Sequence, residues 1–237
     1  MPVRTLPPIS SLILNNLSIL IVGWGLNQGT QIKLPASLRD AGHKQFLTNI
    51  SVIATLICSI VNATNYFVQR DIEVFSNHFK QKFNHFSRHV FLPIALVMET
   101  LVPVVYWPLR LFARHLIMQD VPDNIRNPIP ISVDLAIHLF PTIFLFSDHY
   151  FTGYGSRFEI TNQRAWLMVT VLGVGYNRWL YYLIDLSKGQ AFPYPFLGVA
   201  EPYRSLTFLS LTSFTWVLFW MYQKFPPKTT TPKQKVN

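Results

Sequence analysis

The sequence predicts an all-α fold, a bundle of six transmembrane helices, and two observations indicate this class. Half of the 237 residues are hydrophobic while only 13% are charged, and the mean hydropathy is +0.25. A soluble domain of this length does not have such a composition. The apolar residues also form long runs of roughly 20 residues, the length that a helix needs to cross about 30 Å of hydrocarbon.

Six runs qualify as candidate spans. They comprise residues 9–26, 46–67, 89–112, 131–150, 165–186 and 205–222. Arg4 precedes the first run as in a signal peptide, but Val22-Gly23-Trp24-Gly25 is a poor small-residue cleavage site, so we expect a retained span. Pro93, Pro103 and Pro108 predict a kinked third span, because a proline removes a helical hydrogen bond.

The basic residues predict the orientation of the bundle. Lys and Arg number 20 against 11 Asp and Glu, which gives a formal net charge of +9. Because these residues are scattered among short connecting segments, we interpret the charge as membrane orientation and expect no nucleic-acid partner. The side that holds both termini carries more Lys and Arg, which predicts cytoplasmic termini. We expect an endoplasmic reticulum membrane, with the plasma membrane as the alternative.

The chain divides into one membrane domain and a short tail. Residues 1–225 contain all six runs, and no internal repeat or second soluble domain is evident. Residues 226–237 are rich in proline, threonine and lysine. This segment has almost no apolar content to bury, so we expect a disordered, basic cytoplasmic tail.

Polar side chains inside the spans carry the functional information, because an ionisable group at membrane depth is costly. His138 lies within the fourth run, and Asp134 precedes it by one helical turn on the same face. Thr48 opens the second run and Arg178 lies in the fifth. Along their helices, Thr48, His138 and Arg178 fall about 3, 10 and 12 Å from the non-cytoplasmic side. A shared membrane half permits a common site.

The chemistry of these residues suits nucleophilic catalysis. A threonine hydroxyl needs a general base within hydrogen-bond reach, and His138 can supply one. The Asp134 carboxylate can orient the imidazole, and Asn49 or a backbone N–H near the start of the second span can stabilise an oxyanion. Arg178 suits a substrate carboxylate. Such a site requires no metal ion and no cofactor.

Each of these residues also has a common structural role. A threonine near a helix start usually caps the helix or bonds to a backbone carbonyl, and a membrane histidine often links helices. Asp134 also suits the positive end of the helix dipole, and Arg178 can pair with an aspartate or reach toward the interface. Glu99 lies deepest and has no assigned partner.

A non-catalytic transporter or structural membrane protein is therefore the competing class. Transport predicts polar side chains across both membrane halves. The cytoplasmic half offers Asn62, Asn65 and Asp148 with few matched charges, which favours a one-sided site.

Three stretches resemble one known family. They are Gly42–Thr48 at the second span, Asp134–His138 continuing through Thr142 in the fourth, and Gly175-Tyr176 with Trp179 leading through Gly189 to Tyr194-Pro195-Phe196-Leu197. Together they are similar to the androgen-induced protein family, also called the androgen-dependent tissue-factor-pathway-inhibitor-regulating family. The resemblance extends over Ile9 to Tyr222 and preserves the order and spacing of the spans.

The resemblance implies a multi-pass threonine hydrolase that cleaves fatty acid esters of hydroxy fatty acids, with Thr48 as nucleophile and His138 as base. Its lipid substrate would enter from the bilayer. A broader lipid esterase is the alternative within enzymes. The chain departs from the family pattern at five positions, namely Lys44 and Gln45 in place of tryptophan and lysine, Asp134 in place of asparagine, Leu135 in place of a histidine, and Arg178 in place of an apolar residue.

Overall fold

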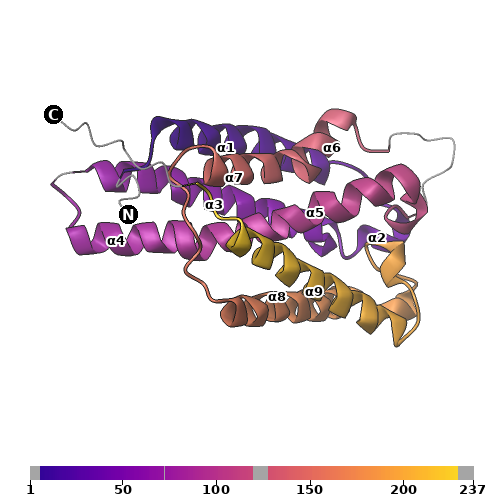
Figure 1. Ribbon diagram of the computed structural model, residues 1–237. Helices are drawn as coiled ribbons and strands as arrows, with labels where there is room; N and C mark the ends of the chain where they lie inside the picture. Colours follow the sequence, from indigo (N-terminus) through magenta and orange to yellow (C-terminus); the bar gives the residue numbers. More distant parts are fainter. Residues whose placement is uncertain (1–5, 72, 120–127, 229–237) are drawn as a thin grey trace, which may run out of the picture.

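The computed structural model describes residues 6–71, 73–119 and 128–228, which form helices and loops with no strand among them. The long helices form a bundle in which α9 crosses the axis of the others obliquely (Figure 1). They are α1 (Ile9–Thr30), α3 (Leu47–Arg70), α5 (Leu92–Phe112), α8 (Asn162–Leu183) and α9 (Tyr203–Lys224). Shorter helices are α2 (Ala36–Arg39), α4 (Asn77–His85), α6 (Ile131–His138) and α7 (Phe140–Tyr150). Arg4 and tail residues 229–237 lie outside the described residues.

Four helices are long and apolar enough to cross a membrane. They are α1, α3, the continuous helix Asn77–Phe112 and α9, and α6 with α7 makes a fifth candidate if the pair is one bent span. Helix α8, where the fifth span was expected, is not among them, because polar residues such as Asn177 and Arg178 lower its hydropathy. The described helices thus supply four or five candidate spans, fewer than the six predicted.

The fourth predicted span is not a single straight helix. It breaks at Leu139 into α6 and α7, which are bent by 40°. Pro141 lies in the first turn of α7, and a proline in this position lacks the N–H that would continue the ladder from α6. The indole Nε1 of Trp107 on α5 donates to the carbonyl of His138 at 3.2 Å, so the break is stabilised from a neighbouring helix.

The third predicted span is longer than expected and belongs to a helix of 36 residues, about 54 Å long. Helix α4 passes through a π-helical segment, Phe86–Phe91, directly into α5, and α5 continues through Pro103 and Pro108 without a break. The wider turn of the π-helical segment lies where Ser87 and Arg88 are buried in the bundle. Such π-bulges recur at functional positions of helices.

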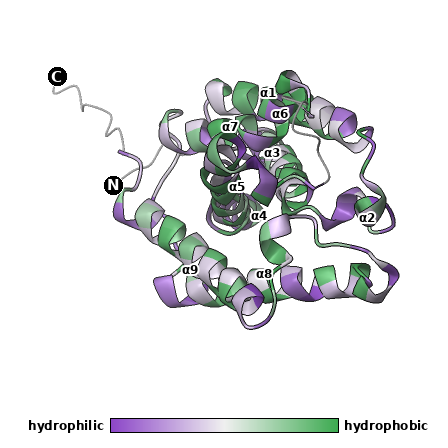
Figure 2. Ribbon diagram, turned by 90° about the vertical axis from the view of Figure 1, so that its right-hand side faces the viewer, coloured by the Kyte–Doolittle hydropathy of each residue, from purple (hydrophilic) through white to green (hydrophobic). Residues whose placement is uncertain are grey.

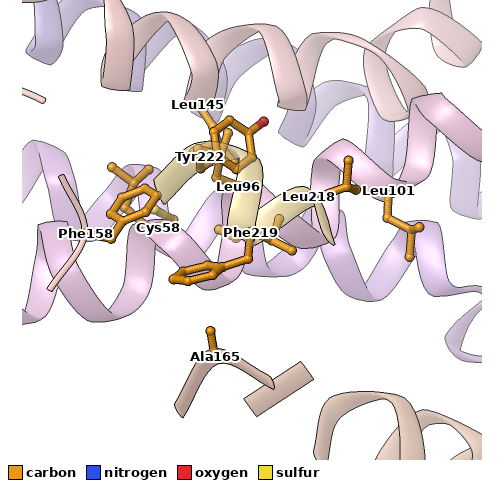
Figure 3. Close-up of a cluster of buried hydrophobic side chains, with 12 residues drawn as sticks. Cys58, Leu96, Leu101, Leu145, Phe158, Ala165, Leu218, Phe219 and Tyr222 are labelled. Atoms are coloured by element: carbon orange, nitrogen blue, oxygen red, sulfur yellow. The ribbon is translucent and has the colours of Figure 1, made fainter. Parts of the chain in front are cut away.

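The helices pack around an apolar core that joins α9 to the rest of the bundle. Figure 3 shows Phe219 and Tyr222 of α9 beside Leu96 of α5 and Leu145 of α7. Helices α8 and α9 form an antiparallel pair on one flank of the bundle, as both Figure 1 and Figure 2 show. Helix α8 packs chiefly against α9, and α9 in turn packs against α5. Helix α8 therefore stands partly away from α3 and α5.

Close approach of α1 to α6 depends on Gly25. A Cβ added at Gly25 would lie 2.5 Å from the Cβ of Ala136, so Gly25→Ala forces the two helices apart. We expect this substitution to destabilise the fold by about 1–3 kcal/mol, the usual effect of overpacking. Thermal unfolding in detergent measures the effect as a lowered Tm.

Gly23→Ala is the matched control on the same helix. Its Cβ would meet only a Leu56 methyl at 3.8 Å, an ordinary contact, so the Tm should not fall. Equal losses for the two variants would contradict the packing of α1 against α6.

Candidate functional site

A large apolar cavity separates the α8 and α9 pair from α3 and α5. Its volume is about 640 Å³, within the range of small-molecule sites. Its wall consists mostly of aliphatic and aromatic side chains, among them Leu47, Ile50, Met98, Leu101, Val105, Val169, Leu172, Phe208 and Leu211. An interior of this kind suits a hydrocarbon chain rather than a polar metabolite.

Thr48 lies in the wall of this cavity. It is the second residue of α3 and is only 7% exposed. The phenol of Tyr194, in the loop between α8 and α9, faces the Thr48 hydroxyl and the backbone N–H groups of Leu47 and Thr48. Burial raises the pKa of Tyr194, so the phenol keeps its proton at neutral pH and can donate a hydrogen bond. The cavity therefore presents a hydroxyl and hydrogen-bond donors at one point of an apolar wall.

A buried aspartate holds His138 in a defined orientation. The imidazole Nδ1 lies 2.8 Å from Oδ1 of Asp134, one turn earlier on α6. The Tyr106 hydroxyl donates to the same Oδ1 at 2.6 Å, and the Arg110 guanidinium lies 3.3 Å from Oδ2. Because the hydrogen bonds of the ring run through Nδ1, Nε2 is the nitrogen left for proton transfer.

Tyr106 lies at the boundary between the cavity and this histidine. Its ring lines the cavity and stacks on the His138 imidazole, with centroids 3.6 Å apart and planes within 2°. His138 and Asp134 are not part of the cavity wall, and no hydrogen bond joins Thr48 to His138. The structure thus places the nucleophile and base predicted from the sequence on either side of Tyr106 rather than in direct contact.

The remaining predicted site residues differ in their relation to the cavity. Asn49 lines it, but its amide donates to the carbonyl of His43 at 2.8 Å, which occupies one of its N–H groups. Arg178 is exposed on α8 and is not part of the cavity wall. The adjacent Trp179 does line the cavity, and so does Lys44, to whose carbonyl the Trp179 indole donates at 3.0 Å. Among the described residues that line the cavity, Lys44 is the one basic residue, and it is exposed.

Sequence reasoning missed the residues that connect this site. Tyr106 and Arg110 are one turn apart on α5 and both contact Asp134, a spacing that could have indicated a shared face in the third span. Tyr194 was part of a recognised motif without an assigned role. Within the described ranges, no group of three or more His, Cys, Asp or Glu side chains is arranged to hold a metal ion.

Two curated relatives resemble the chain over most of its length. The UPF0641 membrane protein YHR140W of Saccharomyces cerevisiae is 48% identical over 222 residues, covering 94% of this chain and 92% of the relative. The UPF0641 membrane protein PJ4664.05 of Schizosaccharomyces pombe is 25% identical over 205 residues, covering 86% and 84%. No solved structure matches the chain.

These relatives are named as membrane proteins, in agreement with the long apolar helices of the structure. Residues 12–226 match the model of the FAR-17a/AIG1-like protein family. This range contains the residues that line the cavity and the Asp134–His138 pair. The chain is therefore a membrane protein that belongs to the FAR-17a/AIG1-like family.

Proposed function

We propose that this protein is an intramembrane hydrolase of lipid esters, with Thr48 as nucleophile and His138 as general base. One observation carries the proposal: Thr48 lies in the wall of a lipid-sized apolar cavity, and another residue of that wall, Tyr106, stacks on an aspartate-oriented histidine. Fatty acid esters of hydroxy fatty acids are the proposed substrates, because they combine long hydrocarbon chains with an internal ester.

The acylation step follows from these positions. His138 Nε2 accepts the proton of the Thr48 hydroxyl while Oγ1 forms a bond to the ester carbonyl carbon. The tetrahedral intermediate collapses, the bond to the leaving oxygen breaks, and His138 returns the proton to that oxygen, so the hydroxy fatty acid leaves as an alcohol. Thr48 keeps the acyl group as an ester.

Tyr106 explains why the two residues are not in contact in the resting structure. Catalytic hydrogen bonds often form only when substrate is bound. The Tyr106 ring lines the cavity and covers the stacked imidazole, so Nε2 of His138 can reach Thr48 only if this ring turns aside. In this proposal, a lipid that fills the cavity displaces the Tyr106 ring and opens the path between the two residues.

The start of α3 provides the oxyanion site. The Leu47 and Thr48 N–H groups belong to the first turn of the helix, where the backbone dipole favours negative charge. Tyr194 faces the same point with a protonated phenol. These donors stabilise the oxyanion in a site from which the apolar cavity excludes bulk water.

Lys44 binds the free carboxylate of the substrate in this proposal, in place of Arg178. Lys44 is exposed but is among the residues that line the cavity, and it precedes Thr48 by four residues. In this proposal its ammonium group meets the substrate carboxylate at the end of the cavity where α3 begins. Arg178 points away to the exposed surface of α8.

The proposed topology has six spans, because α8 is added to the five candidates above. Both termini then lie in the cytoplasm, and the membrane is that of the endoplasmic reticulum. Helix α8 has the same length as α9, 22 residues, and the two approach closely where Gly173 meets Thr212. The end of the bundle at which α1 begins is also the end at which α9 finishes (Figure 1). An even number of spans requires this arrangement.

Substitution of the nucleophile tests the proposal. Purified Thr48→Ala should lose labelling by a fluorophosphonate probe and hydrolysis of the lipid ester, because no hydroxyl remains to attack. His138→Ala should lower kcat by about 10²–10⁴-fold, the usual contribution of a general base. Thr64→Ala, which removes an exposed hydroxyl from the same helix, is the control and should behave as wild type. Labelling that survives Thr48→Ala would exclude Thr48 as nucleophile.

A second prediction concerns the carboxylate. Lys44→Met should raise KM for an ester that carries a free carboxylate and leave KM for its methyl ester unchanged, because only the first substrate forms the ion pair. Arg178→Met is the matched control and should change neither value. The reverse pattern would assign the carboxylate to Arg178.

A further inference from the structure

A row of buried polar side chains runs along the inner face of α3, and we name this row the polar seam. Its members on α3 are Ser51, Thr55, Ser59, Asn62 and Asn65, each 3% exposed or less. It spans 14 residues of helix, about 21 Å. The polar side chains thus extend through both halves of α3, further than the one-sided site expected from the sequence.

The seam begins at the protein surface at the end of the bundle opposite Thr48. Gln69, which is partly exposed, donates to Asn65 at 3.0 Å. One turn further in, Asn62 accepts from Ser87 at 2.6 Å and lies beside the buried ion pair of Arg88 and Asp148. This end is partly exposed to solvent at Gln69, and the buried ion pair lies below it.

In the middle of the bundle the seam continues through facing hydroxyls. Ser59 donates to Ser18 of α1 at 3.0 Å, and Thr55 follows one turn later with a buried hydroxyl that has no hydrogen-bond partner among the described residues. At the far end, Ser51 donates to the backbone carbonyl of Thr48 at 2.9 Å. The seam therefore ends at the backbone of Thr48, whose side chain lines the cavity.

Glu99 of α5 lies beside the polar seam and is fully buried. Ser51 and Thr55 are the side chains that face its carboxyl group, yet neither oxygen of Glu99 has a hydrogen-bond partner in the described structure. Helix α7 contributes only Thr142, which donates to the Glu99 backbone carbonyl. An unpartnered carboxyl group at this depth is costly, whereas a buried water needs two to four polar partners, which Glu99, Thr55 and Ser51 supply.

We propose that the polar seam delivers the hydrolytic water to Thr48 and that Glu99, Ser51 and Thr55 hold it. This inference rests on the proposed hydrolase function and deepens it. Hydrolysis consumes water, but the apolar cavity is filled by lipid during the reaction and offers water no polar partners. The seam reaches Thr48 from the opposite end, so lipid and water approach the nucleophile by separate routes.

The water completes the reaction as follows. His138 takes one proton from the water, whose oxygen forms a bond to the acyl carbon on Thr48. The bond between that carbon and Thr48 Oγ1 then breaks, His138 returns the proton to Oγ1, and the fatty acid leaves. Acylation needs no water, so the seam affects only this second step.

Pre-steady-state kinetics separates the two steps. Thr55→Val removes one hydroxyl from the seam at nearly constant volume, and Glu99→Leu removes the carboxyl group. Both variants should keep the acylation burst of the wild type and lose at least about tenfold in steady-state turnover, the effect of losing one or two buried hydrogen bonds. Glu99→Gln should retain most of the turnover, because an amide still binds water. Thr64→Val is the matched control on the exposed side of α3.

The burst amplitude counts folded sites, so a misfolded variant is distinguished from a slow one. Equal turnover in Thr55→Val, Glu99→Leu and wild type would overturn the seam as a water route. Loss of burst and turnover together, in a variant that keeps the wild-type Tm, would assign these residues to acylation instead. A wild type that does not hydrolyse the ester at all would overturn the hydrolase proposal itself, and the next experiment still decides whether the seam is hydrated.

Thiol accessibility tests hydration without any reaction. In a Cys58→Ala background, Ser59→Cys places a thiol in the seam, while Ile57→Cys places one on the outer face of α3 at nearly the same depth. A small, charged methanethiosulfonate reagent should modify Ser59→Cys and spare Ile57→Cys. Protection of both thiols, or modification of Ile57→Cys alone, would contradict a seam that is open to solvent.

Discussion

Hydrocarbon cannot form hydrogen bonds, and this constraint governs how the helices of the protein pack. Helix α3 carries polar side chains along one whole face, and burial inside the bundle keeps them away from lipid. Helix α1 provides the complement with Ser11, Asn15 and Ser18 on its own buried face. The rotation of α1 against α3 follows from these contacts, because turning either helix would expose polar groups to lipid.

The same constraint concentrates charge at two places. Asp148 is paired with Arg88 at one end, and Asp134 is surrounded by Arg110, Tyr106 and His138 at the other. Removing one partner from such a buried pair leaves an uncompensated charge, which is strongly destabilising. The cluster around Asp134 therefore serves stability as well as the proposed chemistry. Its structural role is to hold α5 against α6, and its chemical role is to present Nε2 of His138.

Much of this arrangement could be predicted from the sequence. The composition and the apolar runs predict a helical membrane bundle, and the spacing of Asp134 and His138 alone places them on one helical face. Pro141 alone could have predicted the bend at Leu139, because a proline lacks the N–H that would continue the helix. The polarity of α8 was visible in its own residues, although the length of the run suggested a span.

What could not be predicted depends on how each helix is rotated. The depth of Arg178 was estimated from the sequence, but depth does not distinguish the cavity side of α8 from its outer side, where the residue lies. The position of Tyr106 between the cavity and His138 requires the packing of α5 against α6. The small hydroxyl residues of α3 looked unremarkable one by one, and only their common burial shows the seam.

The central claim is that Thr48 carries the acyl group during turnover. Peptide mass spectrometry of protein quenched with acid during hydrolysis of a lipid ester tests it most directly. The peptide containing Thr48 should gain the mass of the substrate's acyl chain less one hydrogen, and fragmentation should assign the group to Thr48. An acyl group on another residue, or turnover with no acylated peptide in a quenched sample, would exclude Thr48 as the acyl carrier.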